Sequence, residues 1–465
     1  MGAAVFAGAM IVAVVTIEVF RRRRFGLLDF CFMFQAMFAV NYFVAPVLIY
    51  LPAGHIEQGQ GAALVFYLPT IAHRGLSAGA FNTALLWASI GYGAILGGYF
   101  AADRVLSRQS WWPKPLGEAP INARLLLVVA SALLLLASLA LGLYVLSLRY
   151  QPRGSDADYG LETFFRGIDT LRQEPTKFGF LKHLALLAMP ASLMFVAVGL
   201  RRCGWISLVA WGLAAAAFFF TVTVLFHNSG RIEMIAYLVL LPLAVIVRGA
   251  RVNPYMVMLV FCTAGFWALF GDNMFSLFTS PKTPEVFHAA LTQLVITPSR
   301  SFVSLLGQLS YPLVVLANTL HVVPQEVSYR WFVDLPFGVI YLLPKILIGS
   351  DWPQTLNLIN GAMFGMPIPI DLLSFGFFSL GYLGLVLVAV LFGLLLRFLD
   401  GWLDPSGGWL VAMFRVAWLT YLPVRIMSAD PYASFKSGFQ LIVGTMILLA
   451  MVHLAARHSN ADRES

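Results

Sequence analysis

The chain has 465 residues, of which 60% are hydrophobic and 11% are charged, and its formal net charge is +8. Soluble domains carry about a quarter charged residues, so this composition excludes a soluble domain and predicts an all-α, polytopic membrane protein. The three cysteines form no CxxC or metal-ligand spacing, which gives no sign of a disulfide framework or a zinc site.

The first apolar run ends at Arg21–Arg24. Because these charges follow the run and no small-residue cleavage site intervenes, we expect a membrane helix and not a cleaved signal. The positive-inside rule places this end in the cytoplasm and the N-terminus outside. With the first helix, the following segments give about 11 spans in a single transmembrane domain, 1–465: 26–52, 78–102, 123–147, 181–200, 205–227, 231–248, 255–279, 372–398, 408–425 and 437–456.

Two long segments, 148–180 and 280–371, are expected to form periplasmic loops, whereas most other loops are short. The second contains two apolar stretches, 302–320 and 331–349, and prolines interrupt both. Since proline removes a backbone donor and kinks a helix, we interpret these stretches as interfacial or re-entrant helices of the outer leaflet. If both crossed the membrane instead, the chain would have 13 spans. The number of spans would still be odd, so the two ends of the chain would keep their expected sides.

Several cationic side chains lie on the expected outer side, against the positive-inside rule. Guanidinium groups remain ionised and bind phosphate oxygens in pairs, so together these side chains indicate a site for an anionic lipid head group. Snorkelling of each side chain to lipid phosphates is the alternative explanation. The candidate diphosphate ligands are Arg231, Arg300, Arg330, Arg425 and His227.

Transfer of a sugar onto a hydroxyl requires a base within reach of the acceptor proton. Asp351 in GSDWPQ and Asp430 in MSADPYASF rank first, because both lie beside tight turns next to basic residues. His288 and His321 are weaker candidates. Each acid also has the simpler explanation of a solvated loop residue.

Asp156 and Asp158 form a D-x-D pair of the kind that can hold a divalent ion on a diphosphate. Such pairs are common by chance, and we expect no metal and no other cofactor. Arg415 lies inside an apolar run, and we interpret it as a side chain that snorkels toward the cytoplasm.

Three stretches resemble the Wzy-type polysaccharide polymerases, most closely the branch that polymerises enterobacterial common antigen: NSGRIEMIAY (228–237), ITPSRSFVSLL (296–306) and IYLLPKILIGSDWPQTLNLINGAMFG (340–365). The glycines of the following segment, 369–403, match a Gly-rich helix of that family. The chain departs from the family after IGSD, where relatives carry a further basic residue. It departs again at Ala429, where relatives have an arginine beside the acid.

This resemblance implies a GT-C-like, inverting, metal-independent glycosyltransferase. It would join undecaprenyl-diphosphate-linked oligosaccharides at the periplasmic face of the bacterial inner membrane, during synthesis of O-antigen or exopolysaccharide. Its implied partners are these lipid-linked sugars, membrane lipids, a flippase and a chain-length regulator, and no nucleic acid. An O-antigen ligase and a flippase or other transporter remain the alternative functions.

Overall fold

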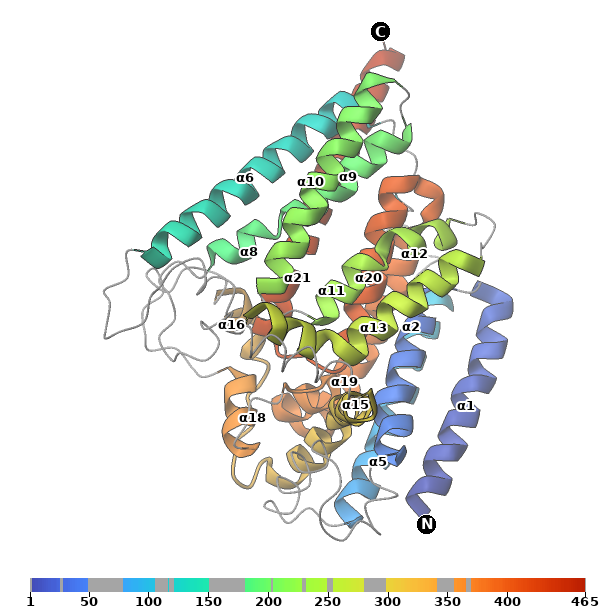
Figure 1. Cartoon of the computed structure of the whole chain (residues 1–465). Helices are drawn as coiled ribbons and strands as arrows, with labels where there is room; N and C mark the ends of the chain where they lie inside the picture. Colours follow the sequence, from blue (N-terminus) through green and yellow to red (C-terminus); the bar gives the residue numbers. More distant parts are fainter. Residues whose placement is uncertain are drawn as a thin grey trace.

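The computed structural model describes residues 2–25, 28–48, 78–104, 116, 121–149, 180–201, 204–227, 231–248, 254–279, 298–340, 355–364 and 369–464. Within these ranges the chain is all-helical (Figure 1). The elements are α1 (Gly2–Phe25), α2 (Phe30–Phe38), the π-helix η1 (Ala39–Val44), α5 (Ala78–Arg104), α6 (Ala123–Arg149), α8 (Leu181–Ala185), α9 (Ala188–Arg201), α10 (Trp205–His227), α11 (Arg231–Leu238), α12 (Leu240–Val247), α13 (Pro254–Thr279), α15 (Pro298–Val322), α16 (Asp334–Ile340), α18 (Leu356–Phe364), α19 (Leu372–Trp402), the 3-10 helix η4 (Pro405–Gly407), α20 (Trp409–Val424) and α21 (Pro431–Glu464).

Ten helices in the described part of the chain are long and apolar enough to cross a membrane. Each of the eleven segments expected from hydropathy coincides with helical structure, although the segment expected at 408–425 is a shorter helix of 16 residues, α20. The prediction of an all-helical, multi-pass membrane protein is therefore confirmed.

The span expected at 231–248 is two helices, α11 and α12, separated at Val239. Pro242 has no N–H to bond the Leu238 carbonyl, which accounts for the interruption. Hydrogen bonds continue on both sides of it, from Val239 N to Ile235 O (3.0 Å) and from Leu243 N to Val239 O (3.0 Å). The two short helices are therefore successive parts of one interrupted segment.

The apolar stretch at 302–320 differs from the broken segment expected, because α15 is one helix of 25 residues that continues through Pro312. Its length and composition would allow it to cross a membrane. Figure 1 shows α15 end-on while α1, α2 and α6 are seen from the side, so α15 runs steeply across the direction of these helices. In the stretch 331–349, α16 ends at Ile340 and the remainder lies outside the described residues.

Helices α5 and α19 are in direct backbone contact. A Cβ atom at Gly98 would overlap the carbonyl of Val390, and one at Gly393 would overlap the carbonyl of Ile95. Small residues allow this approach, and van der Waals packing then holds the helices together where lipid supplies no hydrophobic driving force. The Gly-rich character of 369–403 thus has a packing role.

Helix α19 bends sharply after its first two turns, where the sequence predicted an uninterrupted span. Leu380 has φ −152° and ψ 33°, and Gly381 has φ +60° and ψ −146°. The positive φ is a conformation that glycine adopts without steric cost. Gly376 and Gly384, on either side of the bend, then meet backbone to backbone. Residues 372–379 form a short helix that is buried throughout.

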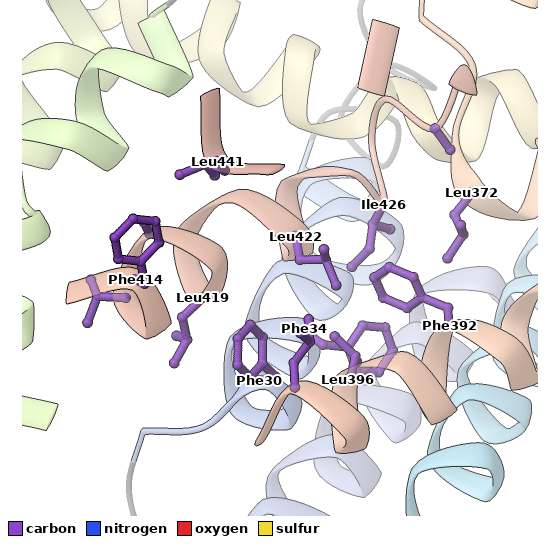
Figure 2. Close-up of a cluster of buried hydrophobic side chains, with 14 of the residues drawn as sticks. Phe30, Phe34, Leu372, Phe392, Leu396, Phe414, Leu419, Leu422, Ile426 and Leu441 are labelled. Carbon is purple, nitrogen blue, oxygen red and sulfur yellow. The ribbon is translucent and has the colours of Figure 1, made fainter. Parts of the chain in front are cut away.

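The core lies between α2, α19, α20 and α21. Figure 2 shows buried hydrophobic side chains of this core, which come from helices that are far apart in the sequence. Among them, Phe30, Phe34 and Leu396 are fully buried. The other labelled members of this cluster are Leu372, Phe392, Phe414, Leu419, Leu422, Ile426 and Leu441.

Candidate functional site

The turn between α20 and α21, residues 425–430, pairs with the segment that leads into α19. Ala429 N donates to Ile370 O (2.7 Å), and Leu372 N donates to Ile426 O (2.9 Å). Tyr311 of α15 donates to the Met427 carbonyl (3.2 Å). Two predicted site residues, Arg425 and Asp430, therefore sit at the two ends of a turn that is fixed by its neighbours.

Asp430 caps helices. Its Oδ1 accepts from Ala433 N (3.2 Å) in the first turn of α21, and Pro431 occupies the following position, where a missing N–H costs nothing. Its Oδ2 accepts from Asn357 N (2.8 Å) in the first turn of α18. The side chain is buried, and this burial raises the pKa of the Asp430 carboxyl above its ordinary value, although the backbone N–H donors oppose the shift.

The guanidinium of Arg330 is bound to Asp334, four residues later in the chain. Its Nε and Nη2 donate to the two carboxylate oxygens of Asp334, at 2.7 and 2.6 Å. Asp334 begins α16, and α16 packs against the start of α21, where a Cβ at Gly338 would overlap Pro431. The structure therefore brings Arg330 close to Asp430, but with its guanidinium already bound to a carboxylate.

Arg425 lies at the opposite side of the same turn. Its Nη2 is 3.5 Å from Oε1 of Glu233 in α11, and its guanidinium lies 4.5 Å from the centre of the Tyr421 ring. Its Nε is buried without a partner among the described residues. Since Arg231 begins α11, two residues before Glu233, Arg425 and the first turn of α11 occupy one end of the bundle.

Asp371, at the same end, was not among the preferred acids. It caps α19, and its Oδ2 accepts from the Tyr42 hydroxyl (2.5 Å), Leu373 N (3.1 Å) and Ser374 N (3.2 Å). Complete burial raises the pKa of the Asp371 carboxyl to about 6, although these hydrogen bonds oppose the shift. An aspartate directly before a long apolar run is the sequence signal for such a cap.

Other predicted residues are placed only by their helices. His227 ends α10, Arg231 begins α11 and Arg300 lies in the first turn of α15, but the described structure does not extend to their side chains. Asp351 lies outside the described residues, as do the acids of the D-x-D pair and His288. A shared cavity lined by Arg231, Arg300 and a carboxylate stays a prediction.

The interpretation of Arg415 was wrong, because its side chain is buried and does not snorkel. Its Nη2 donates to Oδ1 of Asp400 (2.7 Å), and its Nη1 donates to the carbonyls of Asp400 (3.1 Å) and Leu403 (3.0 Å). Asp400 lies near the end of α19, so this ion pair is at the other end of the helix from Asp371. Burying either charge alone would cost a large desolvation free energy, so Arg415 and Asp400 are buried as a pair.

Within the described ranges, no group of three or more His, Cys, Asp or Glu side chains is arranged to hold a metal ion. Comparison of the chain with protein-family models, with curated proteins and with solved structures finds no match. The fold thus defines a class, that of multi-pass helical membrane proteins, and the functional assignment depends on the residues at the α20–α21 turn.

Proposed function

We propose that the chain is a polysaccharide polymerase that joins undecaprenyl-diphosphate-linked oligosaccharides at the periplasmic face of the inner membrane. The observation that supports it most is Arg425, a partly buried side chain at the α20–α21 turn whose buried Nε has no partner in the described part of the chain. It lies beside the helix that Arg231 begins. Two arginines at one end of the bundle suit a diphosphate.

In the proposed reaction, a sugar hydroxyl of the incoming lipid-linked unit attacks the anomeric carbon of the growing chain. The bond from that carbon to the diphosphate oxygen breaks with inversion, and undecaprenyl diphosphate leaves with the electron pair. Arg231, Arg300 and Arg425 stabilise the negative charge that develops on the leaving group. Asp430 or Asp351 takes the acceptor proton.

The diphosphate-binding role is tested with purified full-length protein in lipid nanodiscs and a synthetic lipid-linked repeat unit, by measuring chain length on gels. Arg425→Ala is expected to lower polymer formation by about 10²–10³-fold, the effect of removing one donor to a developing charge. Arg425→Lys should restore it only partly, because a point charge does not reproduce the guanidinium fork. Arg248→Ala is the matched control, since Arg248 lies 4.8 Å over the Trp409 ring at the other end of α20. Equal activity of Arg425→Ala and Arg248→Ala would refute the assignment.

The role of Asp430 needs a separate comparison, because capping alone explains its contacts. Asparagine also caps helices, but it does not accept a proton at neutral pH. If Asp430 is the base, Asp430→Asn should accumulate normally and form no polymer. If Asp430 only caps, Asp430→Asn should remain active, and the base would have to be sought at Asp351.

A transporter of lipid-linked oligosaccharides is the second candidate. The buried Arg415–Asp400 pair favours it, because ionisable groups packed between membrane helices often mark ion or substrate pathways. The nanodisc assay separates the two functions: a polymerase lengthens the glycan, whereas a transporter leaves every lipid-linked unit at its original length.

A further inference from the structure

Asp29 and Asp400 meet at the end of the bundle where α2 begins and α19 ends. Asp29 caps α2 by accepting from Phe32 N (2.7 Å). Asp400 Oδ1 accepts from Phe30 N (3.2 Å), which joins the two segments directly. Both carboxylates are buried. Arg415, which binds Asp400, lies ten residues before Arg425 along α20, so at 1.5 Å per residue this place is on the order of 15 Å from the α20–α21 turn.

The hydroxyl of Tyr99 on α5 lies between these two acids. Its oxygen is 2.8 Å from Oδ2 of Asp400 and 3.5 Å from Oδ2 of Asp29. A phenol has one hydrogen, so it donates to only one carboxylate at a time. The 2.8 Å contact with Asp400 is a hydrogen bond, whereas the 3.5 Å contact with Asp29 is longer than an ordinary O–H···O bond. If the two groups draw together, the second contact becomes a hydrogen bond when one of the carboxyl groups carries a proton and donates it to the Tyr99 oxygen.

The charges that face this pair are unequal in number. Arg21 of α1 binds Asp29 and also binds both carboxylate oxygens of Glu18, at 2.6 and 2.7 Å. Arg415 of α20 binds Asp400. Among the described residues at this cluster, three carboxylates thus face two guanidinium groups, which leaves one excess negative charge if all are ionised.

Neighbouring groups within the described ranges do not remove the excess. Arg397 of α19 is bound to Asp103 of α5 through both Nε (3.0 Å) and Nη2 (2.6 Å). The other titratable side chains nearby, the Cys31 thiol of α2 and the Tyr92 hydroxyl of α5, bind Gln35 and carry no charge at neutral pH. An uncompensated buried charge is costly, and a bound proton neutralises it.

We propose that Asp29, Tyr99 and Asp400 form a proton-binding site between α2, α5 and α19, separate from the α20–α21 turn. One proton is held along the line from Asp29 through the Tyr99 oxygen to Asp400. The unpartnered, buried Nε of Arg415 shows that donors and acceptors of this cluster are not all matched within the described chain. Burial, and then the charge of Asp400, raise the pKa of the Asp29 carboxyl to about 7, although Arg21 opposes the shift.

Loss of this proton places a second full negative charge beside Asp400 and weakens the contact of α2 with α5 and α19. Under the orientation expected from Arg21–Arg24, this end faces the cytoplasm, so the site would respond to cytoplasmic pH. The inference concerns the binding of a proton and holds whether or not the chain is a polymerase.

The test is infrared spectroscopy of the purified full-length protein in nanodiscs, titrated between about pH 5 and about pH 9. Besides the Asp371 band, which is lost near pH 6, the wild type should show the carbonyl band of one further protonated carboxyl group that is lost with a midpoint near pH 7. Asp29→Asn and Asp400→Asn should each lose this titrating band. Asp103→Asn is the matched control, because that acid is paired with Arg397 and should leave the band in place.

Tyr99→Phe tests the geometry without changing any carboxylate. It should keep the titrating band but move its midpoint by about half a pH unit or more, because the shared hydrogen-bond partner is gone. Persistence of the band in both Asp29→Asn and Asp400→Asn would overturn the proposal, as would the absence of any titrating carboxyl band in this range when Asp371→Asn is used as the background. If an asparagine variant fails to accumulate, an unchanged midpoint in Tyr99→Phe would also overturn it.

Discussion

The close approach of α5 and α19 can be tested at two adjacent glycines of one helix. Gly98 is buried, and a Cβ there would overlap the Val390 carbonyl, whereas Gly97 is exposed and has nothing within 4 Å of its Cβ position. We therefore compare Gly98→Ala with Gly97→Ala. The two substitutions add the same methyl group to neighbouring positions, and only the first meets the backbone of α19.

The magnitude follows from two opposing effects. Replacing glycine by alanine within a helix favours folding by up to about 1 kcal/mol, and both variants gain this. At Gly98 the methyl group also forces the helices apart, and inserting a methyl group into a well-packed interior costs about 1–3 kcal/mol. Gly98→Ala should therefore be less stable than Gly97→Ala by roughly 1–3 kcal/mol, with Gly97→Ala equal to or slightly above the wild type.

The assay is thermal unfolding of each purified variant in the same detergent, with the amount of folded protein checked by size-exclusion chromatography. Gly393→Ala provides an independent repeat from the other helix, because its Cβ would overlap the Ile95 carbonyl. If Gly98→Ala and Gly97→Ala unfold at the same temperature, backbone contact between α5 and α19 does not hold the two helices together.

Three further outcomes follow from the buried charges. If Asp430 is the base, polymer formation should fall as the pH drops through a value above the ordinary pKa of aspartate, and rate measurements across pH would show this acid limb. Because the pKa of Asp371 is raised in the folded protein, the folded state binds this proton more tightly than the unfolded chain does. This stabilisation is complete below pH 3.8 and is lost as the pH rises through about 6. The free energy of unfolding of the wild type should therefore fall by about 3 kcal/mol over that pH range. The free energy of unfolding of Asp371→Asn, which still caps α19, should not show this fall. Arg415→Leu should destabilise the protein by about 3–5 kcal/mol, because it leaves Asp400 buried without its partner, and a smaller loss in the double variant Arg415→Leu/Asp400→Leu would confirm the cause.

Hydropathy was sufficient to locate the helices, because each apolar run long enough to cross a membrane must satisfy its own backbone hydrogen bonds. It gave no sign of the bend in α19, since Leu380 and Gly381 lie inside a run that is apolar on both sides. The expectation that proline breaks a helix held at one position and failed at another. Helix α15 continues through Pro312, whereas Pro242 interrupts its segment. The difference depends on what surrounds the missing donor, which a single sequence does not specify.

The candidate site was predicted less completely than the fold. The sequence named Arg425 as an outer-side cation and Asp430 as an acid beside a tight turn, and in the structure the two lie at the ends of one turn. Their roles in binding and catalysis stay predictions. It gave no indication that Glu233 would face Arg425, or that Asp29 and Asp400 would meet from opposite parts of the chain. Such contacts arise from the packing of helices distant in sequence.

The bend separates α19 into one part whose length must match the bilayer and another part that is buried in protein. Beyond Gly381, 21 of its 31 residues remain, and at about 1.5 Å per residue they extend about 31 Å, close to a hydrocarbon thickness of about 30 Å. This part alone is matched to the bilayer, so a thinner membrane should increase its tilt. The buried segment 372–379 has no lipid to match. The depth of Asp371 and its bond to Tyr42 are set by protein packing, and they should stay constant when the thickness of the surrounding membrane changes.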